Sequence, residues 1–169
     1  MLSETADAIM DAAERRIRKA GYSGFSFREI AADVGVKSAS VHYHFPTKER
    51  LAASVARRYT ERFLSALDQE AVPGRTEIEA WITAFRRALH GDGKMCLCGV
   101  LGATSHDLPE EVMIEARRFF QLCLEKLEKR GLSHAKAVQT LAALEGAMLL
   151  ANVLGDPSTF DEATASLAA

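Results

Sequence analysis

The sequence has few cysteines and no long apolar run, and both absences narrow the class of protein. Only three of the 169 residues are cysteine, too few for the disulfide framework of a small secreted domain. No uninterrupted apolar stretch approaches the roughly 18 residues of a membrane-spanning helix. The N-terminal MLSETADAIMDAAERRIRKAGY lacks the basic start, apolar middle and cleavage site of a signal peptide. We therefore expect a cytoplasmic protein with no membrane partner.

The chain also lacks a large excess of charge of either sign. Its formal net charge is −2, which does not by itself suggest a nucleic-acid-binding protein. The charges are nevertheless unevenly distributed, because residues 1–60 carry ten Lys and Arg against seven Asp and Glu, and the remainder carries eleven against sixteen. A basic N-terminal part weakly indicates an anionic partner at that end, although random scatter explains the same pattern equally well.

Strand-like alternation of apolar and polar residues is missing as well. Apolar residues recur instead at helical spacing, first in the stripe formed by Ala6, Ile9, Met10, Ala13 and Ile17. The chain is long enough for one ordinary domain, or for a small domain fused to a larger helical one. We predict an all-α fold of about nine helices with no internal repeat.

Capping residues and chain breaks predict where the helices lie. A capping-box pattern starts a helix over 26–34, and a short helix over 38–44 must end before Pro46. Thr47 can cap a long helix, which the sequence Val72-Pro73-Gly74 separates from the rest of the chain at a boundary. Further helices are expected at about 76–89, 96–104, 109–129, 133–153 and from 157 to the C-terminus.

Residues 27–46 have the spacing of a helix-turn-helix. Ala31 is small enough for two helices to cross closely, and Gly35 can adopt a left-handed turn without steric cost. Val41 can anchor the second helix in the core. Helix geometry then turns a polar set outward, namely Lys37, Ser38, Ser40, His42, Tyr43 and His44.

The outward residues suit DNA better than they suit metal or catalysis. Lysine and tyrosine side chains contact phosphates, and serines reach bases or phosphates, so the short helix fits the major groove. His42 and His44 lie two positions apart, which places them about 200° apart around a helix. They therefore share no face for a metal clamp, and an exposed short helix offers no cleft for a general base.

Over residues 25 to 55, FSFREIAADVGVKSASVHYHFPTKERLAASV, the sequence resembles the TetR family of transcriptional regulators. The resemblance rests on HYHF followed by P-T-K-E and on the leucine that opens the next helix. It implies a homodimer in which residues 1–47 form a three-helix DNA-binding head. Residues 48–169 would supply a connecting helix and a helical body that binds a small-molecule effector and dimerises.

The resemblance also implies how such a protein acts. Most members are repressors, not enzymes, and need no cofactor or metal. Effector binding swings the two heads apart, so that they no longer match successive major-groove half-sites of a palindromic operator. The chain begins almost at its first helix, so we expect none of the extra minor-groove reading that some members obtain from a basic N-terminal arm.

Family contacts with DNA carry over to matching positions of this sequence. Ser26 and Arg28 resemble phosphate and base contacts. Base or backbone contacts are implied for Lys37, Ser38, Ser40 and His42, and phosphate contacts for Tyr43, His44 and Lys48.

The same resemblance places the dimer interface in the last two long helices, which would form a four-helix bundle with their copies. The candidate residues are Leu141, Leu144, Met148, Leu149 and Leu154, with small Ala142, Gly146 and Ala147 for close approach. The alternative is a purely intramolecular core.

The stretch MCLCGVLGATSHDLP leaves three alternatives open for the cysteines. Cys96 and Cys98 are too close in sequence for an unstrained mutual disulfide. Together with Cys123 and His106 they could bind zinc, although the spacing matches no common finger. A thiol sensor of electrophiles or redox state would need an accessible, low-pKa Cys96 or Cys98, assisted by Lys94. Otherwise the cysteines are small apolar side chains near a pocket.

The effector pocket is expected between helices of the body. Its candidate walls are Trp81, Phe85, Cys98, Leu101, Met113, Arg117, Phe120 and Cys123, with Arg117 as a carboxylate partner. Each of them also suits an ordinary core position. A small enzyme using Cys96 or Cys98 with His106 is a remote alternative, because the sequence has no recognisable nucleophile motif.

Overall fold

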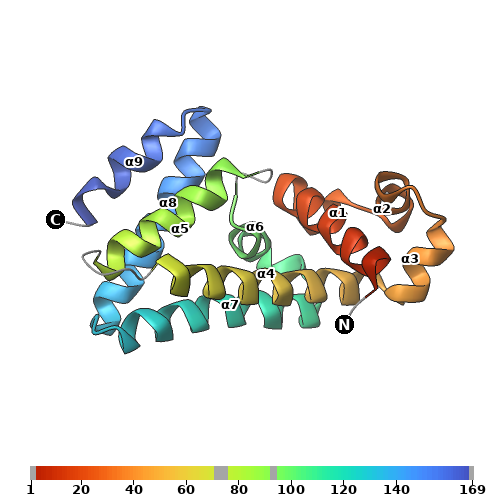
Figure 1. The fold of residues 1–169 in the computed structure, drawn as a ribbon, viewed down its shortest axis with the longest axis horizontal. Coiled ribbons are helices and arrows are strands. Elements are labelled where there is room, and N and C mark those ends of the chain that lie inside the picture. The colour runs from red at the N-terminus through yellow and green to blue at the C-terminus, as the bar shows by residue number, and fades with distance from the viewer. Residues whose placement is uncertain (1–2, 71–75, 92–94, 168–169) are drawn as a thin grey trace. The chain divides into compact units, whose positions relative to one another are not determined.

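The computed structural model describes residues 3–70, 76–91 and 95–167, and its regular elements in these ranges are all helical (Figure 1). The α-helices are α1 Glu4–Ala20, α2 Phe27–Val34, α3 Ser38–His44, α4 Lys48–Glu70, α5 Glu77–His90, α6 Leu97–Ala103, α7 Glu110–Lys129, α8 His134–Leu154 and α9 Ser158–Thr164. Short 3-10 helices lie at Tyr22–Gly24, Ser105–Asp107 and Ala165–Leu167. The prediction of an all-α fold is confirmed.

The helices begin where the sequence supplies a capping side chain. The hydroxyl of Ser26 accepts a hydrogen bond from the Glu29 backbone N–H at 3.3 Å, and Thr47 accepts one from the Arg50 backbone at 3.2 Å. Such bonds satisfy backbone donors that have no partner within the helix. The predicted break at Val72-Pro73-Gly74 and the proposed assistant Lys94 lie outside the described residues.

The chain divides into two compact units, each built from two stretches of sequence. The first unit consists of the described residues up to Tyr59 together with Leu97–Arg117, and the second consists of those in Thr60–Cys96 and Arg118–Ala169. Helices α4 and α7 each contribute residues to both units.

The core of the first unit combines fully buried aliphatic residues with buried aromatic rings such as Phe25 and Phe45. Ile9 and Ile17 of α1, Ile30 of α2 and Val41 of α3 are fully shielded from solvent, as the helical apolar stripe predicts. Polar contacts add to this packing, because Arg58 of α4 donates to an Asp11 carboxylate oxygen on α1 at 2.6 Å.

The core of the second unit contains a cluster of aromatic rings. The Phe63 ring lies 5.3 Å from the Phe85 ring and 5.4 Å from the Phe119 ring between centroids, within the range of favourable edge-to-face contact. Trp81 is fully buried, and its indole N–H donates to the Glu77 carboxylate at 3.0 Å. The indole is therefore buried without losing its hydrogen bond.

Helix α8 bears on two expectations from the sequence. An 18-residue window of this helix has a mean hydropathy of 1.5, so by length and composition alone α8 could cross a membrane. This was not predicted from the sequence. A core helix of a soluble protein passes the same test, and 39% of the window is buried within the protein. Four of the predicted dimer residues belong to this intramolecular core: Leu141, Leu144, Ala147 and Met148.

Candidate nucleic-acid interface

The α2–α3 connection is a tight turn made by glycine. Gly35 has φ 76° and ψ 29°, the left-handed region, which costs a residue with a Cβ about 1–2 kcal/mol. The Val36 backbone N–H donates to the Ala31 carbonyl at 2.9 Å and closes the end of α2. Ala31 is buried at the helix crossing, and Val41 is fully buried from the α3 side. The helix-turn-helix geometry predicted from these three residues is therefore present.

Helix α3 exposes most of the side chains that were predicted to point outward. Lys37, Ser38 and His42 are exposed, and Tyr43 is 84% exposed. Ser40 and His44 are half-buried rather than fully outward. A phenol as exposed as Tyr43 can donate its hydroxyl to a group outside the protein.

The two histidines of α3 have different ring partners. His42 packs edge-on against Phe27 of α2, with ring centroids 4.6 Å apart. His44 instead packs edge-on against Tyr43 at 5.2 Å. Among the described residues, no three His, Cys, Asp or Glu side chains come together as metal ligands. This geometry gives no support to a metal-sensing site.

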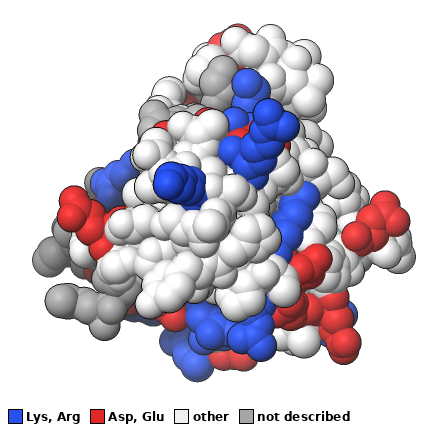
Figure 2. Space-filling view, turned by 90° about the vertical axis from the view of Figure 1, so that its right-hand side faces the viewer, with Lys and Arg blue, Asp and Glu red and all other residues white. Residues whose placement is uncertain are grey.

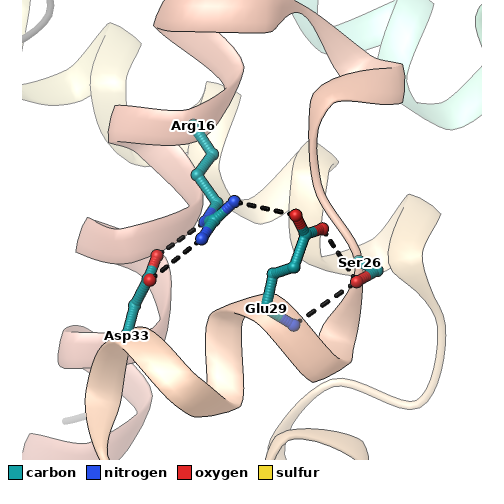
Figure 3. Close-up of polar contacts among 4 residues, drawn as sticks. All are labelled: Arg16, Ser26, Glu29 and Asp33. Atoms are coloured by element: carbon teal, nitrogen blue, oxygen red, sulfur yellow. Dashed lines mark hydrogen bonds and ion pairs between the residues drawn. The ribbon is translucent and has the colours of Figure 1, made fainter.

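An ion-pair network holds α2 against α1 (Figure 3). Arg16 of α1 donates through Nε and Nη2 to both carboxylate oxygens of Asp33, at 2.6 and 2.9 Å, and through Nη1 to Glu29 at 3.1 Å. The Asp33 hydrogen bond raises the pKa of Arg16, and the same bond lowers the pKa of Asp33. Arg16 was not predicted from the sequence, because no local spacing connects it to α2.

Ser26 belongs to this network. Its hydroxyl donates to Glu29 at 2.8 Å while it accepts from the Glu29 backbone (Figure 3), and the side-chain bond lowers the pKa of Glu29. The structure thus gives Ser26 a capping role in addition to the DNA contact predicted for it. Arg28, the other predicted contact on this side, is exposed on α2.

Lys48 lies at the first position of α4, against aromatic rings. Its ammonium nitrogen is 4.6 Å from the Tyr22 ring centroid and 4.5 Å from the Phe25 centroid. Burial lowers its pKa. The predicted phosphate contact is therefore a half-buried side chain with a fixed position, not a free surface lysine.

Positive charge is dispersed over this end of the chain. Figure 2 views the side on which Figure 1 draws α2 and α3, and Lys and Arg side chains lie there in several separate groups, some of them beside Asp and Glu. Contact with a polyanion would thus depend on individually placed cations.

The cysteines and the predicted effector-site residues divide between the two units. Cys98 and Leu101 are buried in the first unit, where Met113 is half-buried and Arg117 is exposed. The second unit contains buried Trp81, Phe85, Cys96 and Cys123 and half-buried Phe120. All three cysteines are buried thiols that form no disulfide, and burial disfavours a reactive thiolate. A single pocket formed by these residues stays a prediction.

Comparison with known proteins agrees with this geometry. Residues 9–55 match the family described as bacterial regulatory proteins, tetR family. A TetR transcriptional regulator from Legionella pneumophila is 31% identical, with a TM-score of 0.87, over 98% of this chain and 96% of that chain. A TetR-family regulator from Agrobacterium tumefaciens is 27% identical, with a TM-score of 0.88, over 96% and 95%. Among curated proteins no sequence matches significantly.

The similarity to the Legionella protein extends over nearly the whole of both chains, well beyond the helix-turn-helix itself. The fold, the glycine turn and the exposed α3 are those expected of a regulator, and the comparisons give no sign of an enzyme. The chain belongs to the TetR family of DNA-binding transcriptional regulators.

Proposed function

We propose that the protein is a cytoplasmic homodimeric repressor, which binds a palindromic operator in double-stranded DNA and leaves it when a small-molecule effector binds. The observation that carries the proposal is α3, a short helix anchored through Val41 with Lys37, Ser38, His42 and Tyr43 exposed. Repression and effector release are supported by what is usual in the family.

In the proposed complex α3 enters the major groove. Residues at the N-terminal end of a recognition helix contact base edges, so Lys37 and Ser38 are the proposed readers of sequence. Tyr43, near the other end of α3, is the proposed phosphate contact, because its hydroxyl is free to donate outward.

The proposed dimer interface is the exposed apolar face of α8. Residues 42–74% exposed lie along this helix, namely Val138, Leu149, Leu150, Val153 and Leu154. Gly146 adds to the argument, because a Cβ built on it would meet no atom of the described residues within 4 Å. A second copy packing closely against α8 explains both the exposed apolar residues and the small residue.

The proposed effector site is in the helical body. Phe120 and Cys123 lie one helical turn apart on α7, and the half-buried Phe120 ring leaves a side that a small apolar ligand can cover. The thiol-sensing alternative is not favoured, because Cys96, Cys98 and Cys123 are buried. Slow alkylation of all three by iodoacetamide at neutral pH is therefore expected.

The decisive experiment is selection of DNA from a random duplex pool by the purified protein. We expect enrichment of a palindromic sequence, binding by a dimer, and an affinity that falls steeply with salt. A reporter gene with this sequence in its promoter should be silenced by the protein. Failure to enrich any sequence would remove the basis for a specific repressor, and activation of the reporter would reverse the proposed sign.

A further inference from the structure

Two aromatic side chains outside the helix-turn-helix enclose the Lys48 ammonium. Tyr22 lies in the 3-10 helix after α1, and Phe25 lies just before α2. Their rings meet edge-on, with centroids 6.2 Å apart and an angle of 87°. Lys48 Nζ is about equally far from both, at 4.6 and 4.5 Å, which is within range of a cation–π interaction. We call Tyr22 and Phe25 the aromatic cage.

The cage itself is held in place. Phe25 is only 2% exposed, so its ring is fixed by the core of the first unit. The Tyr22 hydroxyl donates to Glu49 at 3.1 Å. The pKa of Glu49 is lowered by a backbone hydrogen bond and by Thr47, so this carboxylate is a charged acceptor at neutral pH. The residue after Lys48 thereby orients one wall of the cage.

The Lys48 ammonium is not neutralised by an ion pair in the part of the chain that the structure describes. Within 4.0 Å of its ammonium, the described residues supply no carboxylate ion pair. The two carboxylates whose charges act on it are both engaged elsewhere: Glu49 accepts from Tyr22, and Glu29 accepts from Arg16 and Ser26. The ammonium is therefore a cation held against two rings, with no carboxylate partner among the described residues.

The position of Lys48 connects the cage to the proposed recognition helix. Only Phe45, Pro46 and Thr47 separate it from the end of α3. A free lysine side chain loses about 2 kcal/mol of rotamer entropy when it is fixed, and part of that cost disappears when the folded protein has already fixed it. A caged lysine beside α3 thus binds a phosphate better than a mobile one.

We propose that Tyr22 and Phe25 are positioning residues for DNA binding, which hold the Lys48 ammonium in place for a backbone phosphate, with Glu49 orienting Tyr22. This inference rests on the proposed DNA-binding function. It assigns a part in the interface to residues that do not themselves touch DNA.

The test is a double-mutant cycle on DNA affinity with the full chain. Fluorescence anisotropy measures Kd for a labelled duplex enriched by the unaltered protein, over a series of salt concentrations. The variants are Lys48→Ala, Tyr22→Leu, the two combined, and Tyr22→Phe. The charge-matched control is Lys129→Ala, since Lys129 is 78% exposed in the second unit and pairs only weakly with Glu125 at 3.5 Å.

Each variant has a distinct expected result. Lys48→Ala should weaken binding and lower the slope of log Kd against log salt by about 0.9 for each DNA-bound subunit. Tyr22→Leu should weaken binding about two- to fivefold, and should have no further effect in the Lys48→Ala background. Tyr22→Phe keeps the ring and should cost less than about twofold. Lys129→Ala should change neither affinity nor slope.

Three outcomes would overturn the proposal. If Tyr22→Leu weakens binding equally with and without Lys48, Tyr22 acts only through the fold. Tyr22→Phe as weak as Tyr22→Leu would exclude the ring as the cause. Lys48→Ala without effect on affinity or slope would exclude the phosphate contact. Melting curves without DNA check folding, and Tyr22→Met replaces Tyr22→Leu if the latter does not fold.

A failure of the proposed repressor function would be seen in a different experiment, the selection of DNA from a random pool. An unaltered protein that enriches no sequence would refute the specific repressor. The cycle could still be run on a random-sequence duplex, because phosphate contacts do not depend on base sequence.

Discussion

Protonation of Glu145 should make the stability of the protein depend on pH. Burial raises the pKa of this α8 carboxyl from 4.5 to about 7, and a hydrogen bond from the Cys96 side chain opposes the shift. Its Oε1 atom is buried and has no hydrogen-bond partner among the described residues. Between these two pKa values the folded protein binds a proton that the unfolded chain has lost. Stability therefore falls as pH rises from about 4.5 to about 7, and then levels off.

The size of the effect follows from the difference between the two pKa values. A difference of about 2.5 corresponds to about 3 kcal/mol of unfolding free energy. Most, but not all, of this should be lost between pH 5 and pH 8, because the unfolded carboxyl is already partly ionised at the lower pH. Glu145→Gln imitates the protonated form and should remove this contribution.

Urea unfolding at fixed protein concentration and at intervals from pH 5 to pH 8 measures the effect. The stability of Glu145→Gln relative to the natural protein should rise with pH across this range. Glu162→Gln is the matched control, since it removes an exposed carboxylate from neighbouring α9. If the difference between the Glu145→Gln and natural proteins is the same at pH 5 and pH 8, the buried carboxyl does not titrate as argued.

Three further predictions concern the turn, the interface and the dimer. Gly35→Ala should lower the unfolding free energy by about 1 kcal/mol, measured by urea unfolding, because φ is 76°, even though a Cβ would meet none of the described atoms within 4 Å. No loss of stability would mean that the turn relaxes. Tyr43→Phe should weaken binding to both selected and scrambled duplexes by a similar factor of about three, since it removes one phosphate hydrogen bond. If affinity falls only for the selected duplex, Tyr43 contacts a base instead. Val153→Asp should raise the dimer dissociation constant at least about tenfold in sedimentation equilibrium. The control Lys136→Asp, at an exposed polar position on the same helix, should leave it unchanged. If Val153→Asp does not weaken the dimer, the interface lies elsewhere.

Local sequence patterns predicted the helices and the turn well. The cap at Ser26, the end of α2 at Gly35, and the bounds of α3 are fixed by interactions between residues three or four positions apart, which spacing reveals. The anchoring of Val41 in the core likewise follows from helical periodicity. The same rule identified the outward set on α3, and it failed partly for Ser40 and His44, because exposed Ser38 and His42 lie at the same angles from Val41 and periodicity cannot separate the two pairs.

The division of α8 into a buried and an exposed side was not predictable from its composition. The helix is apolar on nearly all sides, so periodicity gave no reason to separate Leu144 and Met148, which are buried, from Leu150 and Val153, which are exposed. Only packing against the rest of the second unit decides which side is free for another chain.

The sequence by itself determined the all-helical fold, the helix-turn-helix and the TetR resemblance, because each depends on residues close together along the chain. The tertiary structure decided which cations are fixed and by what. Arg16 reaches Asp33 across 17 positions, and Tyr22 reaches Glu49 across 27. Such contacts arise only when packed helices bring distant residues together, and no spacing rule within one helix extends that far.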